Sequence, residues 1–230
     1  MKVLIIHPNF PGQYKHIARA LGADPKNQVL FACKPKQEVP DIPGVKRLEY
    51  QATREPTGTI HPYIIGFERA VLNGQALWRL CEKLKREGFT PDVICAHPGW
   101  GEGLFLKDIY PNVPVLYFME FYYHAFGADV YFDPRETHEP NELCRIRVKN
   151  STNLFNLEGC DWAVSPTFWQ KQVHPEVFHH KFSVLHDGID TDVIRPVKKG
   201  TLTLPNGTVL KQGDPLVTYV ARNFEPYRGF

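Results

Sequence analysis

Residues 1–23, MKVLIIHPNFPGQYKHIARALGA, give the clearest indication of the fold class. The apolar run Val3–Ile6 ends at His7 and has the length of a buried strand, too short for a signal peptide or a membrane-spanning helix. A turn that contains Gly12 follows, and a helical pattern extends from Gln13 to Ala23. A buried strand that passes directly into a helix predicts the first unit of a parallel sheet with crossover helices.

The chain repeats this alternation of short apolar runs and longer helical patterns. Strands are expected at Lys2–Ile6, Gln28–Cys33, Val45–Tyr50, Asp92–Ala96, Val113–Met119, Asp161–Val164 and Lys181–His186. Helices are expected at Gln13–Ala23, His61–Glu87, Gly101–Tyr110, Glu139–Leu157 and Thr167–His174. We therefore predict an α/β, doubly wound Rossmann-like parallel sheet with helices on both faces, covering residues 1–190.

The remaining residues, 191–230, do not continue the alternation. Asp187–Pro196 is polar and ends in proline, which is typical of a linker. Thr201–Lys211 contains Asn-Gly between β-prone flanks, which predicts a hairpin. The apolar run Leu216–Ala221 predicts one more strand. We expect this segment to be a linker, a β-hairpin and the first strand of a truncated second domain.

Composition excludes several classes of protein. The chain has 27 Lys and Arg against 25 Asp and Glu, a net charge of +2, which argues against a nucleic-acid partner. Its five cysteines are widely spaced without a CxxC motif, so neither a disulfide framework nor a zinc site is expected. We therefore expect a reducing, cytoplasmic setting and no metal.

Three turns that follow strands carry the candidate chemistry, because ligands collect at the carboxyl ends of parallel strands. Gly12 and Gln13 follow the first strand, where backbone amides would suit a phosphate or a sugar hydroxyl. His97 opens the glycine-rich stretch HPGWGEG and could hydrogen-bond a hydroxyl or transfer a proton. Glu120 begins EFYYH and could accept hydrogen bonds from sugar hydroxyls.

Each of these turns has a plain structural alternative. The Gly12 turn could be tight without binding any ligand, and His97 could satisfy a local carbonyl group. Glu120 could cap a helix beside core aromatic residues. Both interpretations of the Gly12 turn stay open. We favour a functional role for His97, because it follows a strand at the carboxyl edge of the sheet, and for Glu120, because the aromatic rings after it suit stacking on a pyranose. We expect acceptor binding by Tyr122, Tyr123 and His124.

Charged residues near the end of the chain suggest a phosphate site. Arg222 and Arg228 follow the Leu216–Ala221 run, and guanidinium groups bind phosphate oxygens in pairs. The alternative is two surface arginines. The acidic stretch DGIDTD at residues 187–192 lacks the other ligands of a calcium loop, and we expect no metal there.

Taken together, the chain resembles the N-terminal part of glycosyltransferase family 4, retaining enzymes of the GT-B fold. The matching stretches are Ile6–Gln13, Asp92–Glu102, Glu120–Tyr123, Asp161–Gln170, His186–Pro196 and Val217–Phe230. The resemblance implies a two-domain enzyme in which the N-terminal half receives the acceptor and the C-terminal half holds a UDP- or GDP-linked sugar. It implies no cofactor and no required metal.

The resemblance also assigns roles to single residues. Gly12 and Gln13 match the loop that approaches the donor diphosphate, and we place Gly99 with them as donor-binding. Arg222 matches a phosphate-binding arginine, and Arg228 stands where many members have a lysine. Glu120 stands where numerous members have a histidine that touches the donor sugar. We therefore expect Glu120 and His97 to share the catalytic role.

We expect the acceptor-side domain of a retaining glycosyltransferase that transfers a sugar to a saccharide or lipid-linked acceptor. The family's donor domain, with its paired glutamates, does not occur in these 230 residues, so the fragment alone is expected to be inactive. The alternative is a non-catalytic carbohydrate- or nucleotide-binding module. An NAD-dependent oxidoreductase or epimerase is disfavoured because no GxGxxG follows the first strand. Peripheral membrane contact is left open.

Overall fold

The computed structural model describes residues 1–35, 39–128, 131–133, 135, 137, 139–197, 199–221 and 223–224. The chain divides into two compact units, Met1–Asp187 and Gly188–Phe230, and each is described by itself.

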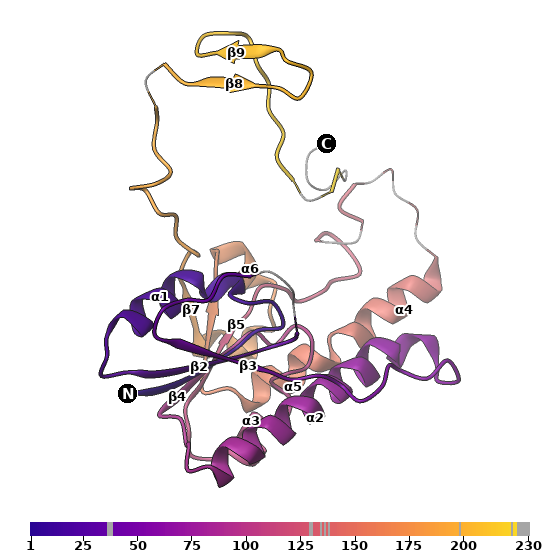
Figure 1. The fold of residues 1–230 in the computed structure, drawn as a ribbon. Helices are drawn as coiled ribbons and strands as arrows, with labels where there is room; N and C mark the ends of the chain where they lie inside the picture. Colours follow the sequence, from indigo (N-terminus) through magenta and orange to yellow (C-terminus); the bar gives the residue numbers. More distant parts are fainter. Residues whose placement is uncertain are drawn as a thin grey trace. The chain divides into compact units, whose positions relative to one another are not determined.

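The first unit contains a seven-stranded sheet in the order β3-β2-β1-β4-β5-β6-β7, and every neighbouring pair is parallel (Figure 1). The strands are β1 (Lys2–Ile6), β2 (Gln28–Cys33), β3 (Val45–Glu49), β4 (Val93–Ala96), β5 (Val115–Phe118), β6 (Trp162–Ser165) and β7 (Phe182–Val184). The strand order grows outward in both directions from β1 and β4, so the predicted doubly wound α/β fold is confirmed.

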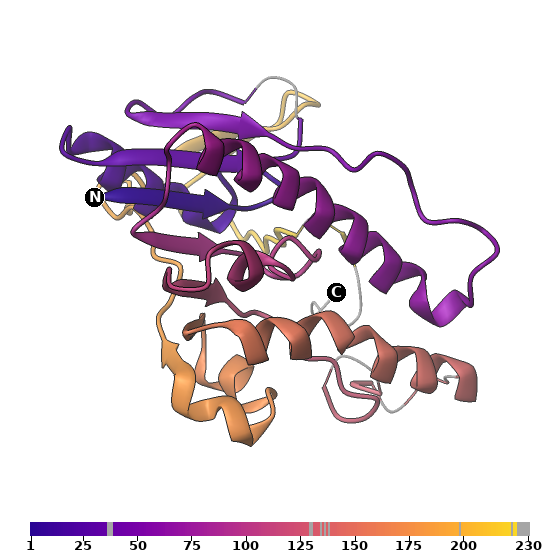
Figure 2. The ribbon, with the colours of Figure 1, turned by 90° about the horizontal axis from the view of Figure 1, so that it is seen from below.

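Helices cover both faces of this sheet (Figure 2). They are α1 (Lys15–Ala23), α2 (Ile65–Arg86), α3 (Leu106–Ile109), α4 (Pro140–Lys149), α5 (Ser151–Gly159) and α6 (Phe168–Gln172), with 3-10 turns η1 (Gly12–Tyr14), η2 (Pro62–Ile64) and η3 (Glu176–Lys181). Side chains alternate along β1: Leu4 and Ile6 pack under α2, whereas Val3 and Ile5 pack under α1. Both faces are therefore buried, which explains the continuous apolar run.

Two helices differ from expectation. The helix expected over Gly101–Tyr110 forms only at Leu106–Ile109. Gly101 itself has a φ of +98°, which a right-handed helix does not allow. The single helix expected over Glu139–Leu157 is two helices, α4 and α5, that meet at Asn150. The side chain of Asn150 bonds to another loop, as described below.

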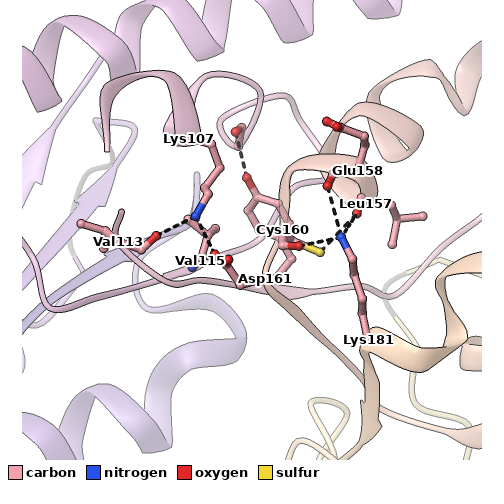
Figure 3. Close-up of polar contacts among 10 residues, drawn as sticks. Lys107, Val113, Val115, Leu157, Glu158, Cys160, Asp161 and Lys181 are labelled. Carbon is pink, nitrogen blue, oxygen red and sulfur yellow. Dashed lines mark hydrogen bonds and ion pairs between the residues drawn. The ribbon is translucent and has the colours of Figure 1, made fainter. Parts of the chain in front are cut away.

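Two lysines fasten the amino-terminal edge of the sheet to its helices (Figure 3). Lys181 Nζ donates to three carbonyl oxygens at the end of α5, on Leu157, Glu158 and Cys160, at 3.2, 3.2 and 2.8 Å. Lys107 Nζ lies 2.8 Å from Asp161 Oδ2, which also accepts from the backbone N–H of β5. A cation at the carboxyl end of a helix satisfies carbonyl groups that have no partner within the helix.

The second unit contains a two-stranded antiparallel sheet, β8 (Thr201–Thr203) and β9 (Val209–Lys211), so the predicted hairpin is confirmed. The further strand expected at Leu216–Ala221 is not formed. In the described part of the chain, residues 216–221 belong to neither sheet. Val217 is accordingly 98% exposed.

Among the described residues, no helix is both long enough and apolar enough to span a bilayer.

Candidate functional site

Three side chains from separate turns meet at the carboxyl edge of the sheet. Glu120 Oε2 accepts a hydrogen bond from Gln13 Nε2 at 3.1 Å and lies 2.9 Å from His97 Nε2. Gln13 follows β1, His97 follows β4 and Glu120 follows β5, and these strands are neighbours in the sheet. The contact lies where the strand order reverses, the usual ligand position in this architecture. We call these three residues the Glu120 cluster.

The hydrogen bonds fix the tautomer of His97. The backbone N–H of Gly99 donates to His97 Nδ1 at 3.1 Å, so Nδ1 carries no proton. Nε2 therefore carries the ring proton and donates it to the Glu120 carboxylate. Both ring nitrogens are engaged within the protein, so His97 is arranged to orient Glu120.

Glu120 itself is held as a carboxylate with one oxygen available. Burial raises the pKa of Glu120, but hydrogen bonds from His97 and Gln13 and the electrostatic effects of the His97 and His7 rings together leave the pKa below its ordinary value. Both donors bind Oε2, and no described residue hydrogen-bonds Oε1. The side chain is 20% exposed, so Oε1 can accept a hydrogen bond from a ligand hydroxyl.

His7 packs against His97 of the Glu120 cluster and lies next to Gly12. The sequence alone did not predict this packing role. The buried ring of His7 packs edge-on against His97 and Trp100, with ring centroids 5.2 and 5.5 Å away. Burial, and then the neighbouring His97, lower the pKa of His7 from its ordinary 6.5 to about 4, so the ring is neutral at pH 7. A Cβ atom on Gly12 would lie 2.6 Å from this ring, and Gly12 has a φ of +51°. Glycine is required here on both grounds.

A cavity of about 460 Å³ opens beside the Glu120 cluster. It is lined by His97 and Glu120 at the strand ends, and by residues of η2, α2, α4 and α5. Aromatic side chains contribute much of the lining: Tyr63, Phe67, Trp100, Phe118, Phe121 and Tyr123. A concave site with aromatic walls and a few polar groups is typical of small-molecule binding.

Buried asparagines hold the loops that border this cavity. Asn150 clamps Tyr123, accepting from its backbone N–H at 2.9 Å and donating to its carbonyl oxygen at 2.7 Å. Asn153 donates to the carbonyl oxygen of Phe121 at 3.0 Å, and Asn73 of α2 donates to that of Trp100 at 2.8 Å. The signal in the sequence is the spacing of asparagines at 150, 153 and 156, which places them on one helical face.

The predicted site residues fall into different surroundings. Gly99 and Tyr123 line the cavity, and a Cβ atom on Gly99 would lie 2.8 Å from the His97 ring. Tyr122 instead packs against the hydrophobic core, with its ring 5.8 Å from that of His174. His124 Nε2 lies 2.6 Å from the carbonyl oxygen of Val173, and neither Tyr122 nor His124 lines the cavity.

Arg222 and Arg228, the predicted phosphate-binding pair, lie outside the described residues. Within the described ranges, no group of three or more His, Cys, Asp or Glu side chains is arranged to hold a metal ion.

Comparison with solved structures finds several matches at low sequence identity. UDP-GlcNAc 2-epimerase from Neisseria meningitidis, bound to UDP-GlcNAc, is 15% identical over 80% of this chain and 45% of its own, with a TM-score of 0.42. Sucrose-phosphate synthase from Thermosynechococcus elongatus is 15% identical over 82% of this chain and 90% of that chain, with a TM-score of 0.47. Phytolacca americana UGT2, complexed with UDP-2-fluoro-glucose and pterostilbene, is 10% identical over 80% and 52%, with a TM-score of 0.48.

The chain thus spans about half the length of the epimerase and of the Phytolacca protein. Among curated proteins, none matches it. The family model described as the glycosyl transferase family 4 group matches residues 25–194. This match extends from the turn before β2 through β7 and includes the turns that carry His97 and Glu120. Because it covers well over half of the sequence, the chain belongs to the glycosyl transferase family 4 group.

Proposed function

We propose that this chain is the acceptor-side domain of a retaining glycosyltransferase, which transfers a sugar from a UDP- or GDP-linked donor to a saccharide or lipid-linked acceptor. Membership of the glycosyl transferase family 4 group supports sugar transfer. Retention at the anomeric carbon rests on the family resemblance. In this proposal the 230 residues act together with a donor domain and do not complete transfer alone.

The main support for the proposal is the Glu120 carboxylate, in which one oxygen is held by hydrogen bonds and the other is accessible to a ligand. Its Oε2 is held by Gln13 and His97, while Oε1 has no hydrogen bond from the described residues and belongs to a side chain that lines the cavity. A carboxylate fixed in this way accepts a hydrogen bond from an acceptor hydroxyl and orients the hydroxyl oxygen. Aromatic rings on the walls contact the C–H faces of a pyranose.

In this proposal the residues of the Glu120 cluster and three other residues have distinct roles. Glu120 binds the acceptor hydroxyl, and His97 and Gln13 position Glu120. Gly12 is proposed to contact the donor, and Arg222 and Arg228 are proposed to bind phosphate. Positive groups stabilise the charge that develops on the departing diphosphate, which is the main electrostatic requirement of the reaction.

A transfer assay on the full-length polypeptide, beside the 230-residue chain, tests the proposal. Both proteins are incubated with UDP- and GDP-linked sugars and saccharide acceptors, and NMR of the product reads the anomeric configuration. We expect transfer with retained configuration by the full-length polypeptide and none by the shorter chain. Saccharide binding without transfer or donor hydrolysis by either protein would contradict the proposal and indicate a binding module. An inverted product would contradict retention.

A further inference from the structure

The cavity beside Glu120 is positively charged as well as aromatic. We propose that its ligand is an anionic saccharide, one that carries a carboxylate or a phosphate group. This inference rests on the proposed acceptor role of the cavity and adds the chemical class of the acceptor.

Cations predominate among the charged side chains that line the cavity in the described part of the chain. They are Arg69 from α2 and Arg145 and Lys149 from α4, against the single carboxylate of Glu120. Both ring nitrogens of His97 are hydrogen-bonded within the protein, to Glu120 and to the backbone N–H of Gly99. The formal charge of the lining is therefore positive, although the whole chain carries only +2.

The acidic neighbours of the two arginines leave this charge largely in place. Arg69 Nε lies 3.5 Å from Glu55, and these side chains are 55% and 83% exposed. Arg145 Nη2 lies 3.3 Å from Glu142, also at the surface. Solvent-exposed pairs of this kind contribute only about 0–1 kcal/mol. Neither acid lines the cavity, so a ligand anion can take over the guanidinium groups.

Aromatic rings lie close to the cationic residues. Phe121 and Tyr123 stack with their centroids 6.0 Å apart and their planes 9° from parallel. Lys149 Nζ lies 3.5 Å from the centroid of the Tyr123 ring. A sugar ring packed on these aromatic residues would place its charged substituent within reach of the basic helical walls.

The negative charge of Glu120, opposite to that of the arginines, would orient a ligand in the cavity. A carboxylate repels an anion and attracts a hydroxyl donor, whereas Arg69 and Arg145 attract the anion. An anionic saccharide would therefore bind with its reacting hydroxyl at the strand ends and its charged group against α2 and α4. A neutral saccharide would lack the second of these two anchors. A volume of about 460 Å³ suits a sugar or a short saccharide.

NMR titration of the 230-residue chain tests this inference directly. The probes are methyl β-glucuronide, glucose 6-phosphate and neutral methyl β-glucoside, and the first two distinguish carboxylate from phosphate recognition. We expect at least one anionic probe to bind about tenfold more tightly than the glucoside at low salt. High salt should narrow the difference because ions screen the exposed guanidinium groups.

Variants assign the effect to the cavity. Arg69→Gln and Arg145→Gln should each weaken anionic binding by about tenfold and leave glucoside binding unchanged. Arg79→Gln on α2 and Arg147→Gln on α4 are matched controls, since both side chains are exposed and neither lines the cavity. The thermal midpoint of each variant checks its fold.

Three results would overturn the inference. Equal affinity for charged and neutral probes would remove the anionic preference while leaving the saccharide-binding role intact. If none of the three probes binds, both the anionic preference and the saccharide-binding role of the cavity are contradicted. UDP serves as a fourth probe. If UDP binds more tightly than every saccharide, and only Arg69→Gln and Arg145→Gln weaken UDP binding, the cavity binds the donor instead.

Discussion

Gly12→Ala should destabilise the first unit more than an ordinary glycine substitution, because it meets two obstacles. The residue has a φ of +51°, where an L-amino acid pays about 1–2 kcal/mol. Its new Cβ would also lie 2.6 Å from the His7 ring, which is buried among Tyr14, His97 and Trp100 and cannot easily move. Overpacking of this kind costs about 1–3 kcal/mol.

The expected loss is therefore about 2–5 kcal/mol in the free energy of unfolding, measured by urea denaturation. Gly88→Ala is the matched control, because Gly88 has a φ of +83° but no atom within 4 Å of the added Cβ. It should lose only the backbone part, about 1–2 kcal/mol.

A double-mutant cycle separates the two obstacles. In a His7→Ala background the ring is gone, so Gly12→Ala should cost no more than Gly88→Ala. A cost for Gly12→Ala that is the same in both backgrounds would refute the assigned contact with His7. A cost equal to that of Gly88→Ala in the unaltered protein would do the same.

Two further predictions concern stability. Lys181→Met should lower the free energy of unfolding by about 1.5–3 kcal/mol because three carbonyl oxygens at the end of α5 lose a charged donor. Lys83→Met removes a surface ion pair with Glu87 at 3.9 Å and should change the free energy of unfolding by less than about 0.5 kcal/mol. Equal losses for the two variants would count against a stabilising role of Lys181 at the end of α5. Burial raises the pKa of Glu102 above its ordinary 4.5, despite a 2.7 Å hydrogen bond from Tyr50. Above pH 4.5 the unfolded chain releases this proton before the folded chain does, so stability falls as pH rises. Glu102→Gln should flatten that fall in melting curves from pH 4 to pH 8, and an unchanged slope would show that Glu102 is not its source.

Much of the fold could be predicted because burial on both faces leaves a direct mark on the sequence. The run Val3–Ile6 is apolar at every position since α1 and α2 cover opposite faces of β1. Strand ends in a parallel sheet also share one edge, which is why Gln13, His97 and Glu120 could each be placed at the rim.

The details of the rim depend on tertiary contacts that leave no local mark. No sequence pattern shows that His97 and Glu120 bond directly, because this requires β4 and β5 to be neighbours. Asn150 fits a helical pattern, yet its side chain bonds to Tyr123 and separates α4 from α5. Tyr122 packs against core residues that are distant in the sequence, so its neighbours are set by the tertiary fold.

Turnover of Glu120→Gln tests the proposal that Glu120 binds the acceptor. The variant keeps the size of the side chain but removes the carboxylate, which is proposed to accept a hydrogen bond from the hydroxyl group of the acceptor substrate. In the full-length polypeptide we expect kcat/KM for transfer to fall on the order of 10- to 100-fold. The thermal midpoint should change far less than the activity. Glu82→Gln, an exposed carboxylate on α2 outside the cavity, is the control and should keep full activity. Unchanged transfer by Glu120→Gln would show that the Glu120 carboxylate does not bind the acceptor.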